Sequence, residues 1–301
     1  MSANAQPLAN PAKVLKLGLP KGSLEEYTLS LFARSGWRIS VGSRNYFPSI
    51  NDPEIACTLC RTQEMTRYVA QGVLDCGFTG KDWRLENGCE VEVITDLIYS
   101  KASPTAARWV LAVPGDGSVV SAADLKGKKV ATELPGLTRK WFAERGVPVE
   151  VEFSWGATEA KVVNGLADAI VEVTETGSTI KAHGLKIIDE IMTTYTEFVA
   201  NPLAILDEFK LAKIQQIALL LKGALAAESL VGLKMNVREK DADHLIALLP
   251  SLNAPTVAHL YRTDWLSVEV VIAAHVVREL APVLLANGAE GIIEYPLNKV
   301  I

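Results

Sequence analysis

Short apolar runs alternate with amphipathic segments over the first third of the chain, and this alternation constrains the fold more than any other feature. The apolar runs predict strands, and helical patterns separate the first three of them. This order favours parallel strands joined by helical crossovers, and ligands of such sheets bind at the carboxyl ends of the strands. The predicted strands are Val14–Leu19, Ile55–Leu59, Val73–Phe78 and Val91–Ile98.

Two helices are predicted between these strands. The first should start at a capping box formed by Ser23 and Glu26 and should run to Gly36. The second should be capped by Thr62 and stopped by Gly72. The two helices therefore begin close to the ends of the strands that precede them.

Cationic residues and a glycine follow three of the strands. Lys21 follows the first strand, Arg61 follows the second, and Gly80 and Lys81 follow the third. A lone lysine on a loop is most often merely solvated. Four such residues at one edge of a sheet nevertheless favour a ligand site.

A second series of strands and helices runs from Arg108 to Met192, after a small and polar segment, Ser100–Ala107, that is a plausible hinge. Thr194–Ala200 then has the pattern of a strand returning to the first series. Two α/β lobes joined by two crossings of the chain form a cleft, which is a preferred place for ligands.

The stretch Ala167–Ile180 is the most informative part of the second series. A buried strand, Ala169–Val171, leads into Glu172 and then into a turn rich in hydroxyl groups, with a helix expected to open at Ile180. Hydroxyls and free amides at a strand-to-helix turn can bind phosphate. A glycine in the turn permits a positive φ or a close approach of the backbone to a ligand. The turn consists of Thr174, Glu175, Thr176, Gly177, Ser178 and Thr179.

The two glutamates of this stretch suit sugar hydroxyls or a divalent cation better than they suit a phosphate. An ordinary polar turn with a solvated glutamate is the alternative interpretation, since short phosphate-like motifs often occur by chance.

The last part of the chain predicts a long helix, Ile205–Ala227, followed by a βαββαβ order between Leu230 and Tyr295. That order is typical of a ferredoxin-like module. No cofactor motif occurs in it, and its scattered histidines are interpreted as structural or solvated.

Composition excludes several classes of protein. Of 301 residues, 49% are hydrophobic and 22% charged, so a sizeable core is expected, and a net charge of −5 argues against nucleic-acid binding. The amino end lacks a secretory pattern, and the most apolar stretch, Ile217–Ala227, is too short to span a membrane. Cys57 and Cys60 have no second C-x-x-C pair, so reduced thiols in a cytoplasmic protein are expected rather than a zinc site.

Several marked features occur along the chain: LPKGSL, Arg61 after its strand, GVLDCGFTGKD, GLADAIVEVTETGSTI, LLPSLNAPTV and GAEGIIEYPLNKVI. Together they resemble the long form of the ATP phosphoribosyltransferase family, from about Lys16 to Ile301. The resemblance implies an α/β fold with a two-lobed, periplasmic-binding-protein-like catalytic core and a C-terminal ferredoxin-like (ACT-like) regulatory domain. The implied parts are lobe I at 12–102 with a return segment at about 193–208, lobe II at 103–192, a linker helix at 209–227, and the regulatory domain at 228–301.

The resemblance also implies two substrate sites. Phosphoribosyl pyrophosphate is expected on the turn, with Glu172 at the ribose hydroxyls and the other residues at the 5-phosphate. Glu172 stands where aspartate is frequent in the family, and Glu175 stands where serine is frequent. The residues implied for phosphoribosyl pyrophosphate are Glu172, Thr174, Glu175, Thr176, Gly177, Ser178 and Thr179, and those implied for ATP are Lys21, Gly22, Arg61, Gly80, Lys81 and Arg108.

The implied reaction is a glycosyl transfer that opens histidine biosynthesis. Nitrogen 1 of adenine attacks the anomeric carbon, and pyrophosphate leaves together with Mg²⁺ that the pyrophosphate itself holds, without a metal site made by the protein. No protein nucleophile is required, and the sequence identifies no catalytic residue or general base. Feedback inhibition by histidine and assembly of dimers into hexamers are implied as well. The implied histidine contacts are Asn236, Leu252, Thr256, Val271 and Gly291.

Two other functions are compatible with the residues. A two-lobed solute-binding protein has the same hinge and cleft, although an export signal and no phosphate-binding turn are expected of it. A non-catalytic regulatory relative would bind the same ligands without turnover.

Overall fold

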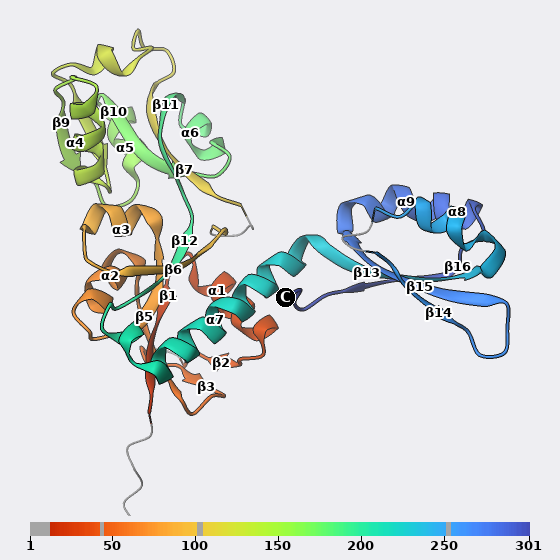
Figure 1. Ribbon diagram of the computed structural model, residues 1–301. Coiled ribbons are helices and arrows are strands. Elements are labelled where there is room, and N and C mark those ends of the chain that lie inside the picture. Colours follow the sequence, from red (N-terminus) through yellow and green to blue (C-terminus); the bar gives the residue numbers. More distant parts are fainter. Residues whose placement is uncertain (1–12, 43–44, 101–104, 251–253) are drawn as a thin grey trace, which may run out of the picture. The chain divides into compact units, whose positions relative to one another are not determined.

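The computed structural model describes residues 13–42, 45–100, 105–250 and 254–301. The chain divides into two compact units, 1–218 and 219–301, which are described separately below. The first unit contains two five-stranded sheets and the second contains one four-stranded sheet (Figure 1).

The first sheet has the strand order β4-β1-β5-β12-β6. Its strands β1, β4 and β5 are parallel, as expected, whereas β12 is antiparallel to both of its neighbours. The returning strand β12 therefore separates the fourth predicted strand from the third. The strands are β1 Leu15–Lys21, β4 Ile55–Arg61, β5 Cys76–Gly80, β6 Glu92–Leu97 and β12 Thr196–Ala200.

Helix α1, Glu25–Ser35, begins without the predicted capping box, because no side chain caps its first residue. Instead, the Gly22 amide donates to the carboxylate of Glu25 at 3.3 Å. The helix ends as predicted at Gly36, which adopts φ 105° and so permits a left-handed C-terminal cap.

Helices α2 and α3 begin directly after β4 and β5. In α2, Thr62–Ala70, the residue Thr62 is the first helical residue rather than the cap. The sequence pattern missed α3, Lys81–Asn87, since a helix of seven residues shows little periodicity. Two short strands, β2 Ile39–Ser40 and β3 Ser49–Ile50, form a separate pair. We call the first sheet with α1, α2 and α3 lobe I.

The second sheet has the order β11-β7-β10-β8-β9. Strands β8, β9 and β10 are parallel, and β7 is antiparallel to both β10 and β11. We call this sheet with helices α4, α5 and α6 lobe II. Its elements are β7 Ala107–Pro114, η1 Ala122–Leu125, β8 Lys129–Thr132, α4 Pro135–Glu144, β9 Glu150–Phe153, α5 Thr158–Val163, β10 Ala169–Thr174, α6 Ser178–Ala182 and β11 Leu185–Thr194.

Helix α7, Glu208–Ala226, follows a short 3₁₀ turn, η2 Ala204–Leu206. It begins later than the apolar pattern predicts. Its first turn is anchored on lobe I by Lys210, whose ammonium lies 2.8 Å from the buried carboxylate of Asp75. A second lysine, Lys213, lies 3.3 Å from the carboxylate of Asp52.

The second unit has the predicted βαββαβ order, and its antiparallel sheet has the strand order β14-β15-β13-β16. One face of this sheet packs its buried side chains, such as Leu233 and Val268, into a core with residues of α8 and α9, which confirms the ferredoxin-like fold. On the opposite face, Gly232 leaves room for Tyr295, because a Cβ at Gly232 would lie 2.2 Å from that ring. The elements are η3 Ala227–Ser229, β13 Leu230–Arg238, η4 Glu239–Asp241, α8 Ala242–Ala247, β14 Thr256–His259, β15 Trp265–Ala273, α9 Ala274–Ala286 and β16 Glu290–Pro296.

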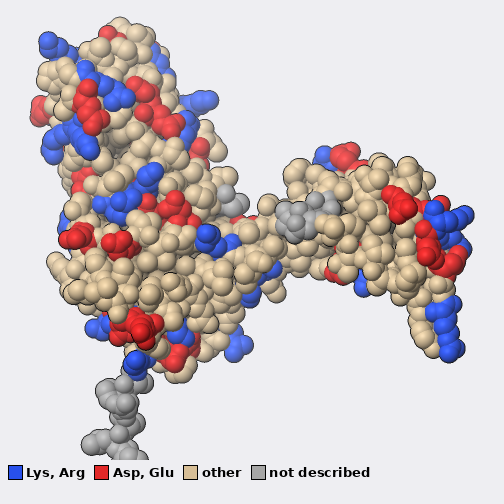
Figure 2. All heavy atoms as spheres, in the orientation of Figure 1, with Lys and Arg blue, Asp and Glu red and all other residues tan. Residues whose placement is uncertain are grey.

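None of the helices in the described residues is long and apolar enough to cross a membrane. On the face shown in Figure 2, Lys and Arg side chains are interspersed with Asp and Glu side chains. The four cysteines, all at described positions, are free thiols. Burial raises the pKa of Cys57 and of Cys60 to about 12, so these thiols stay protonated and act as small apolar groups.

Candidate functional site

A cleft of about 520 Å³ lies between the two lobes of the first unit. Lobe I contributes residues around the start of α3, including Gly80, Asp82 and Trp83. Lobe II contributes Trp109 from β7 and the turn that follows β10. The carboxyl ends of β5 and β10 thus face the same space, as the strand order of such sheets predicts.

The turn after β10 is held by its own hydroxyl groups. The Gly177 amide donates to the Thr174 hydroxyl at 2.8 Å, and the hydroxyls of Thr176 and Ser178 lie 3.0 Å apart. Thr174, Glu175, Thr176, Ser178 and Thr179 all line the cleft. An incoming phosphate would therefore meet several exchangeable hydroxyl and amide donors in one turn.

Gly177 precedes helix α6 and adopts φ 77°, a left-handed conformation that favours glycine. A Cβ at this position would lie 3.1 Å from Cδ1 of Ile187. The helix begins at Ser178, two residues before the predicted start, and has only five residues. Because so short a helix has little dipole, the hydroxyls and amides of the turn carry the interaction with an anion.

Glu172 lies on β10, and its pKa is raised to about 7. Burial is the main cause, the nearby carboxylates of Glu159 and Glu133 raise the pKa further, and the Thr158 hydroxyl lowers it. That hydroxyl is buried, and it is the strongest of the influences that lower the pKa of Glu172. Glu172 consequently titrates near neutral pH.

Lys21, Gly22 and Arg61 lie together at the neighbouring ends of β1 and β4, where Lys21 and Arg61 are paired in register. The Lys21 ammonium stands 3.9 Å from the centre of the Tyr46 ring. The Arg61 guanidinium lies 5.5 Å from the centre of the Trp155 ring in lobe II. These cations are thus oriented by aromatic rings, but they do not line the 520 Å³ cleft itself.

The remaining residues predicted for ATP are placed differently. Gly80 lines the cleft, and Lys81 follows it with its ammonium 5.1 Å from the centre of the Tyr195 ring. Arg108 on β7 pairs with Glu190 of the neighbouring strand at 3.1 Å. The structure therefore brings Gly80 and the turn to one cleft, and it places Arg108 in an ion pair of its own sheet.

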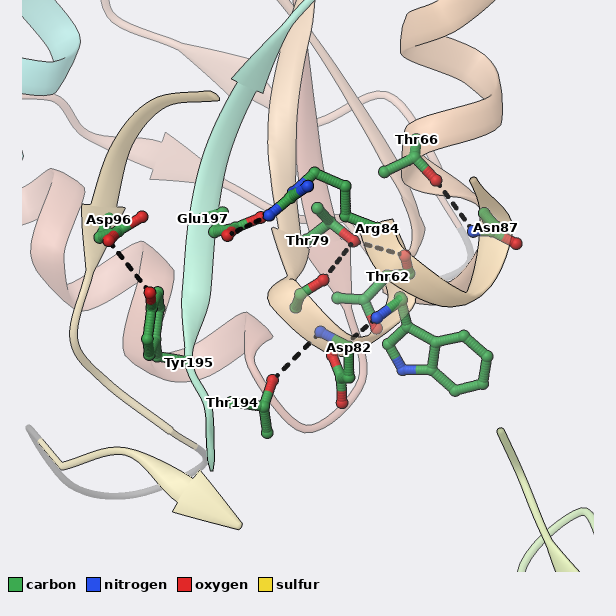
Figure 3. Close-up of polar contacts among 12 residues, drawn as sticks. Thr62, Thr66, Thr79, Asp82, Arg84, Asn87, Asp96, Thr194, Tyr195 and Glu197 are labelled. Atoms are coloured by element: carbon green, nitrogen blue, oxygen red, sulfur yellow. Dashed lines mark hydrogen bonds and ion pairs between the residues drawn. The ribbon is translucent and has the colours of Figure 1, made fainter. Parts of the chain in front are cut away.

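Sequence reasoning missed Asp82, whose carboxylate is buried in the cleft wall. It accepts hydrogen bonds from the Trp109 indole at 2.6 Å and from the Trp83 amide at 2.9 Å. The Asp82 amide donates to the Thr194 hydroxyl at 3.3 Å (Figure 3). Burial raises the pKa of Asp82, whereas the bond from Trp109 lowers it. A sequence signal for Asp82 was the glycine two residues before it in the string GFTGKD. The structure shows why glycine stands there, because a Cβ at Gly80 would collide with the Asp82 carboxylate.

A partly buried ion pair fixes α3 on lobe I. Arg84 donates to the two carboxylate oxygens of Glu197 on β12 at 2.5 and 2.9 Å (Figure 3). The Glu197 side chain is only 2% exposed. Such a bidentate pair restricts the orientation of both side chains, so the start of α3 has a defined position at the cleft.

Acidic side chains outnumber basic ones in the cleft wall. Asp82, Glu133, Glu159 and Glu175 line it, and the described lining residues include no lysine or arginine. Within the described ranges, no group of three or more His, Cys, Asp or Glu residues is arranged to hold a metal ion. A highly charged anion would accordingly need counter-charge from a bound cation or from the cations at the strand ends.

Comparison with known proteins identifies the family. A family profile described as HisG, ATP phosphoribosyltransferase, matches residues 61–223, and one described as HisG, C-terminal domain, matches residues 227–299. The chain belongs to the ATP phosphoribosyltransferase family. The resemblance noted from the sequence strings is thereby confirmed, and the chain is an enzyme of the glycosyltransferase type.

Individual members of the ATP phosphoribosyltransferase family match over nearly the whole chain. The ATP phosphoribosyltransferase of Desulfatibacillum aliphaticivorans is 65% identical over 95% of this chain and 98% of its own length. That of Solidesulfovibrio magneticus is 62% identical over 96% of this chain and 98% of its own length. A solved chain of the ATP phosphoribosyl transferase (HisG:HisZ) complex from Thermotoga maritima is 28% identical, with a TM-score of 0.60, over 69% of this chain and 98% of that one.

The resemblance to the ATP phosphoribosyltransferase family also predicted residues of the second unit that contact the inhibitor histidine. Asn236 and Val271 alternate along their strands with the buried core positions, so they lie on the sheet face opposite to α8 and α9. Thr256 pairs in register with Glu269, which lies on that same face, so Thr256 lies there too. Gly291 lies beside Asn236, since its Cβ would be 3.7 Å from the Asn236 amide nitrogen. Leu252 lies outside the described residues.

Proposed function

We propose that the chain transfers the phosphoribosyl group of phosphoribosyl pyrophosphate to nitrogen 1 of the adenine of ATP and releases pyrophosphate, as the first step of histidine biosynthesis. The observation that carries this proposal is the turn Thr174–Thr179, which lines the cleft opposite Gly80 in a chain of this family. The reaction joins two bound substrates, and a cleft between two lobes can hold one on each side.

The turn binds the 5-phosphate of phosphoribosyl pyrophosphate in this proposal. The Thr174 and Thr176 hydroxyls now accept hydrogen bonds from the Gly177 and Ser178 amides, at 2.8 and 3.4 Å. A phosphate replaces these weak neutral acceptors with charged ones, and hydrogen bonds to a charged group are the stronger kind. The Glu172 carboxylate, when ionised, accepts hydrogen bonds from the ribose hydroxyls.

ATP binds on the side of lobe I. Lys21, Gly22 and Arg61 at the ends of β1 and β4, together with Gly80 and Lys81, form the proposed triphosphate and base contacts. Arg108 belongs to the proposed ATP residues as well, provided that it leaves its ion pair with Glu190.

The chain's own residues have three tasks in the proposed reaction. They hold nitrogen 1 in line with the anomeric carbon, exclude water, and neutralise charge as pyrophosphate departs. The developing oxocarbenium ion needs no protein nucleophile, and no side chain is assigned here as a general base. The carboxylates of the cleft wall favour a cationic ribose and disfavour a bare anion.

We propose that Mg²⁺ is coordinated mainly by the diphosphate of the substrate and not by a metal site made of protein ligands. The described carboxylates form no three-ligand group, and Mg²⁺ commonly retains water while it bridges phosphate oxygens and one or two carboxylates. Glu133 and Glu159, which line the cleft, are the side chains available for such contact. The bound ion would supply positive charge to the leaving group.

A turnover assay tests the proposed reaction. The full chain is mixed with ATP, phosphoribosyl pyrophosphate and Mg²⁺, and the absorbance of phosphoribosyl-ATP is followed. We expect product only when all three are present. A non-catalytic relative, or a binding protein without catalysis, would bind the ligands and form no product, and that result would contradict the proposal.

We propose that histidine binds to the second unit and inhibits the enzyme by feedback. We also propose that the protein forms dimers that assemble into hexamers. Asn236 and Gly291 are adjacent, and Thr256 and Val271 lie on the same face, so these residues can contribute to one surface. We further propose a cytoplasmic location and the division into two lobes, a linker helix at 209–227 and a regulatory domain at 228–301.

The variant Asn236→Ala is expected to raise the histidine concentration for half-inhibition by about tenfold, because it removes an amide that can hydrogen-bond a bound amino acid, a loss of roughly 1.5 kcal/mol. The measurement is the initial rate against histidine concentration at fixed substrates. Lys240→Ala, at an exposed position in η4, is the control and should leave inhibition unchanged. Equal inhibition of the wild type and Asn236→Ala would remove Asn236 from the histidine site.

A further inference from the structure

Helix α3 of lobe I contacts lobe II through a carboxylate at the start of another helix. Glu86 accepts hydrogen bonds from the amides of Gly136 and Leu137, each at 2.8 Å. These two residues belong to the first turn of α4, whose amides have no partner within the helix. A carboxylate also interacts favourably with the positive end of a helix, so this contact joins two lobes by two charge-assisted bonds.

The sequence of α4 leaves space for the contact. A Cβ at Gly136 would lie 3.0 Å from each carboxylate oxygen of Glu86, which is closer than side chains normally approach. Glycine at this position therefore permits the carboxylate to reach both amides. Alanine is otherwise the better residue inside a helix, so local helix stability does not account for glycine here.

A second contact from the same face of α3 reaches lobe II. Asp82 and Glu86 are four residues apart and therefore lie on one side of the helix. The Asp82 carboxylate accepts the indole hydrogen bond of Trp109 at 2.6 Å, and Trp83 packs against the core of lobe II. Asp82 is 6% and Trp109 1% exposed, so water does not separate the lobes there.

The start of α3 is also one of the parts of lobe I that line the cleft. Gly80, Asp82 and Trp83 line the cleft, as does the turn Thr174–Thr179 of lobe II. One short helix thus carries both a wall of the cleft and the contacts to lobe II. A shift of α4 away from α3 would change the separation of the two walls.

We propose that Glu86 is a positioning residue that latches α4 and holds the two lobes in the arrangement that binds both substrates. This inference rests on the proposed function in one respect only, namely which ligands bind in the cleft. Although each substrate has its main proposed contacts on one lobe, it also lies against the wall of the other lobe in the shared cleft, so it binds the latched arrangement. Its apparent affinity, measured with the other substrate well below saturation, falls by the fraction of molecules that leave that arrangement. Loss of the latch therefore weakens both substrates by a common factor, whereas it leaves the rate of the saturated enzyme unchanged.

The test uses the full chain with Glu86→Ala, Glu86→Gln and the control Glu90→Gln, which alters an exposed carboxylate of lobe I. We expect KM for ATP and KM for phosphoribosyl pyrophosphate to rise together by about tenfold in Glu86→Ala, as if one molecule in ten stayed latched. Glu86→Gln, which keeps one acceptor oxygen, should recover part of the affinity, and kcat should stay within about twofold. Unchanged KM values in a folded Glu86→Ala, or a change for one substrate alone, would overturn the proposal.

Gly136→Ala provides a second variant if Glu86→Ala fails to fold. Its Cβ pushes the carboxylate away while alanine favours the helix, and both KM values should rise by a smaller common factor. If they do not, the latch is refuted.

A measurement without any ligand tests the latch independently of the proposed function. It is the exchange rate of the Trp109 indole proton, followed by NMR. We expect exchange about tenfold faster in Glu86→Ala, because opening exposes the bond to Asp82. An unchanged rate in Glu86→Ala refutes the latch whatever the substrates are. Failure of the wild type to form product, with faster indole exchange in the variant, contradicts only the proposed function.

Discussion

Gly177→Asp is expected to weaken the binding of phosphoribosyl pyrophosphate at least 100-fold. The substituted carboxylate would stand in the turn beside the proposed position of the 5-phosphate, and like charges in a partly buried site repel strongly. Because Asp tolerates the left-handed backbone better than most residues, φ 77° at this position should still be adopted. Isothermal titration calorimetry of the wild type and the variant measures the effect.

Two matched variants show whether charge is the cause. Gly177→Asn has nearly the same shape without the charge, so its loss of affinity should be clearly smaller. Gly146→Asp places the same carboxylate at φ 67°, where a Cβ would meet nothing within 4 Å, and it should bind like the wild type. Equal losses in Gly177→Asp and Gly177→Asn would show that steric contact with Ile187, rather than repulsion of a phosphate, explains the result.

Affinity for phosphoribosyl pyrophosphate is expected to rise about tenfold between pH 6 and pH 8 through the ionisation of Glu172, whose pKa is about 7. In the proposed site the charged carboxylate of Glu172 accepts hydrogen bonds from both ribose hydroxyls, and the population of this charged form grows as the pH passes through the pKa. Glu172→Gln should bind more weakly at pH 8 and should lack this dependence. Glu172→Gln is an essential control, because the phosphate of the substrate also titrates in this pH range. The difference between the affinity–pH profiles of the wild type and of Glu172→Gln isolates the contribution of Glu172.

The same ionisation gives a prediction for stability in the absence of ligand. The pKa of Glu172 is raised in the folded state from an ordinary 4.5 to about 7, so the folded chain binds this proton more tightly than the unfolded chain. Its stabilising contribution is present below pH 4.5 and is lost as the pH rises to about 7. Glu172→Gln should therefore raise Tm more at pH 8 than at pH 5. A Tm that falls equally at both pH values would contradict the assignment of a carboxylate whose pKa is raised by burial.

Local patterns predicted the elements that are long or strongly marked. The run Ala169–Val171 had to be a buried strand, and the spacing in the second unit led to the ferredoxin-like order, because apolar alternation directly reflects one covered face. Gly36 was predicted as the end of the first helix, and its left-handed conformation, φ 105°, is the physical reason why the helix ends there. The turn around Gly177 was found because five small or hydroxyl-bearing residues follow a buried strand.

Contacts that depend on distant parts of the chain could not be predicted. The strand β12 enters the first sheet between β5 and β6, although its residues lie about a hundred positions later in the sequence. Asp82 looked like an ordinary turn residue, and its role in the cleft wall depends on Trp109 from the other lobe. The predicted capping box at Ser23 failed because Glu25 provides the bond to a backbone amide instead.

Hydrogen exchange of the backbone amides at Thr176–Thr179 tests the central claim most directly, because these amides are the proposed ligands of the 5-phosphate. The full chain is incubated in heavy water with phosphoribosyl pyrophosphate and Mg²⁺, with ATP alone, or without ligand. Phosphoribosyl pyrophosphate should slow exchange in this turn at least tenfold, while ATP alone should leave it unchanged. Unaltered exchange there under conditions in which phosphoribosyl-ATP is being formed would contradict the account.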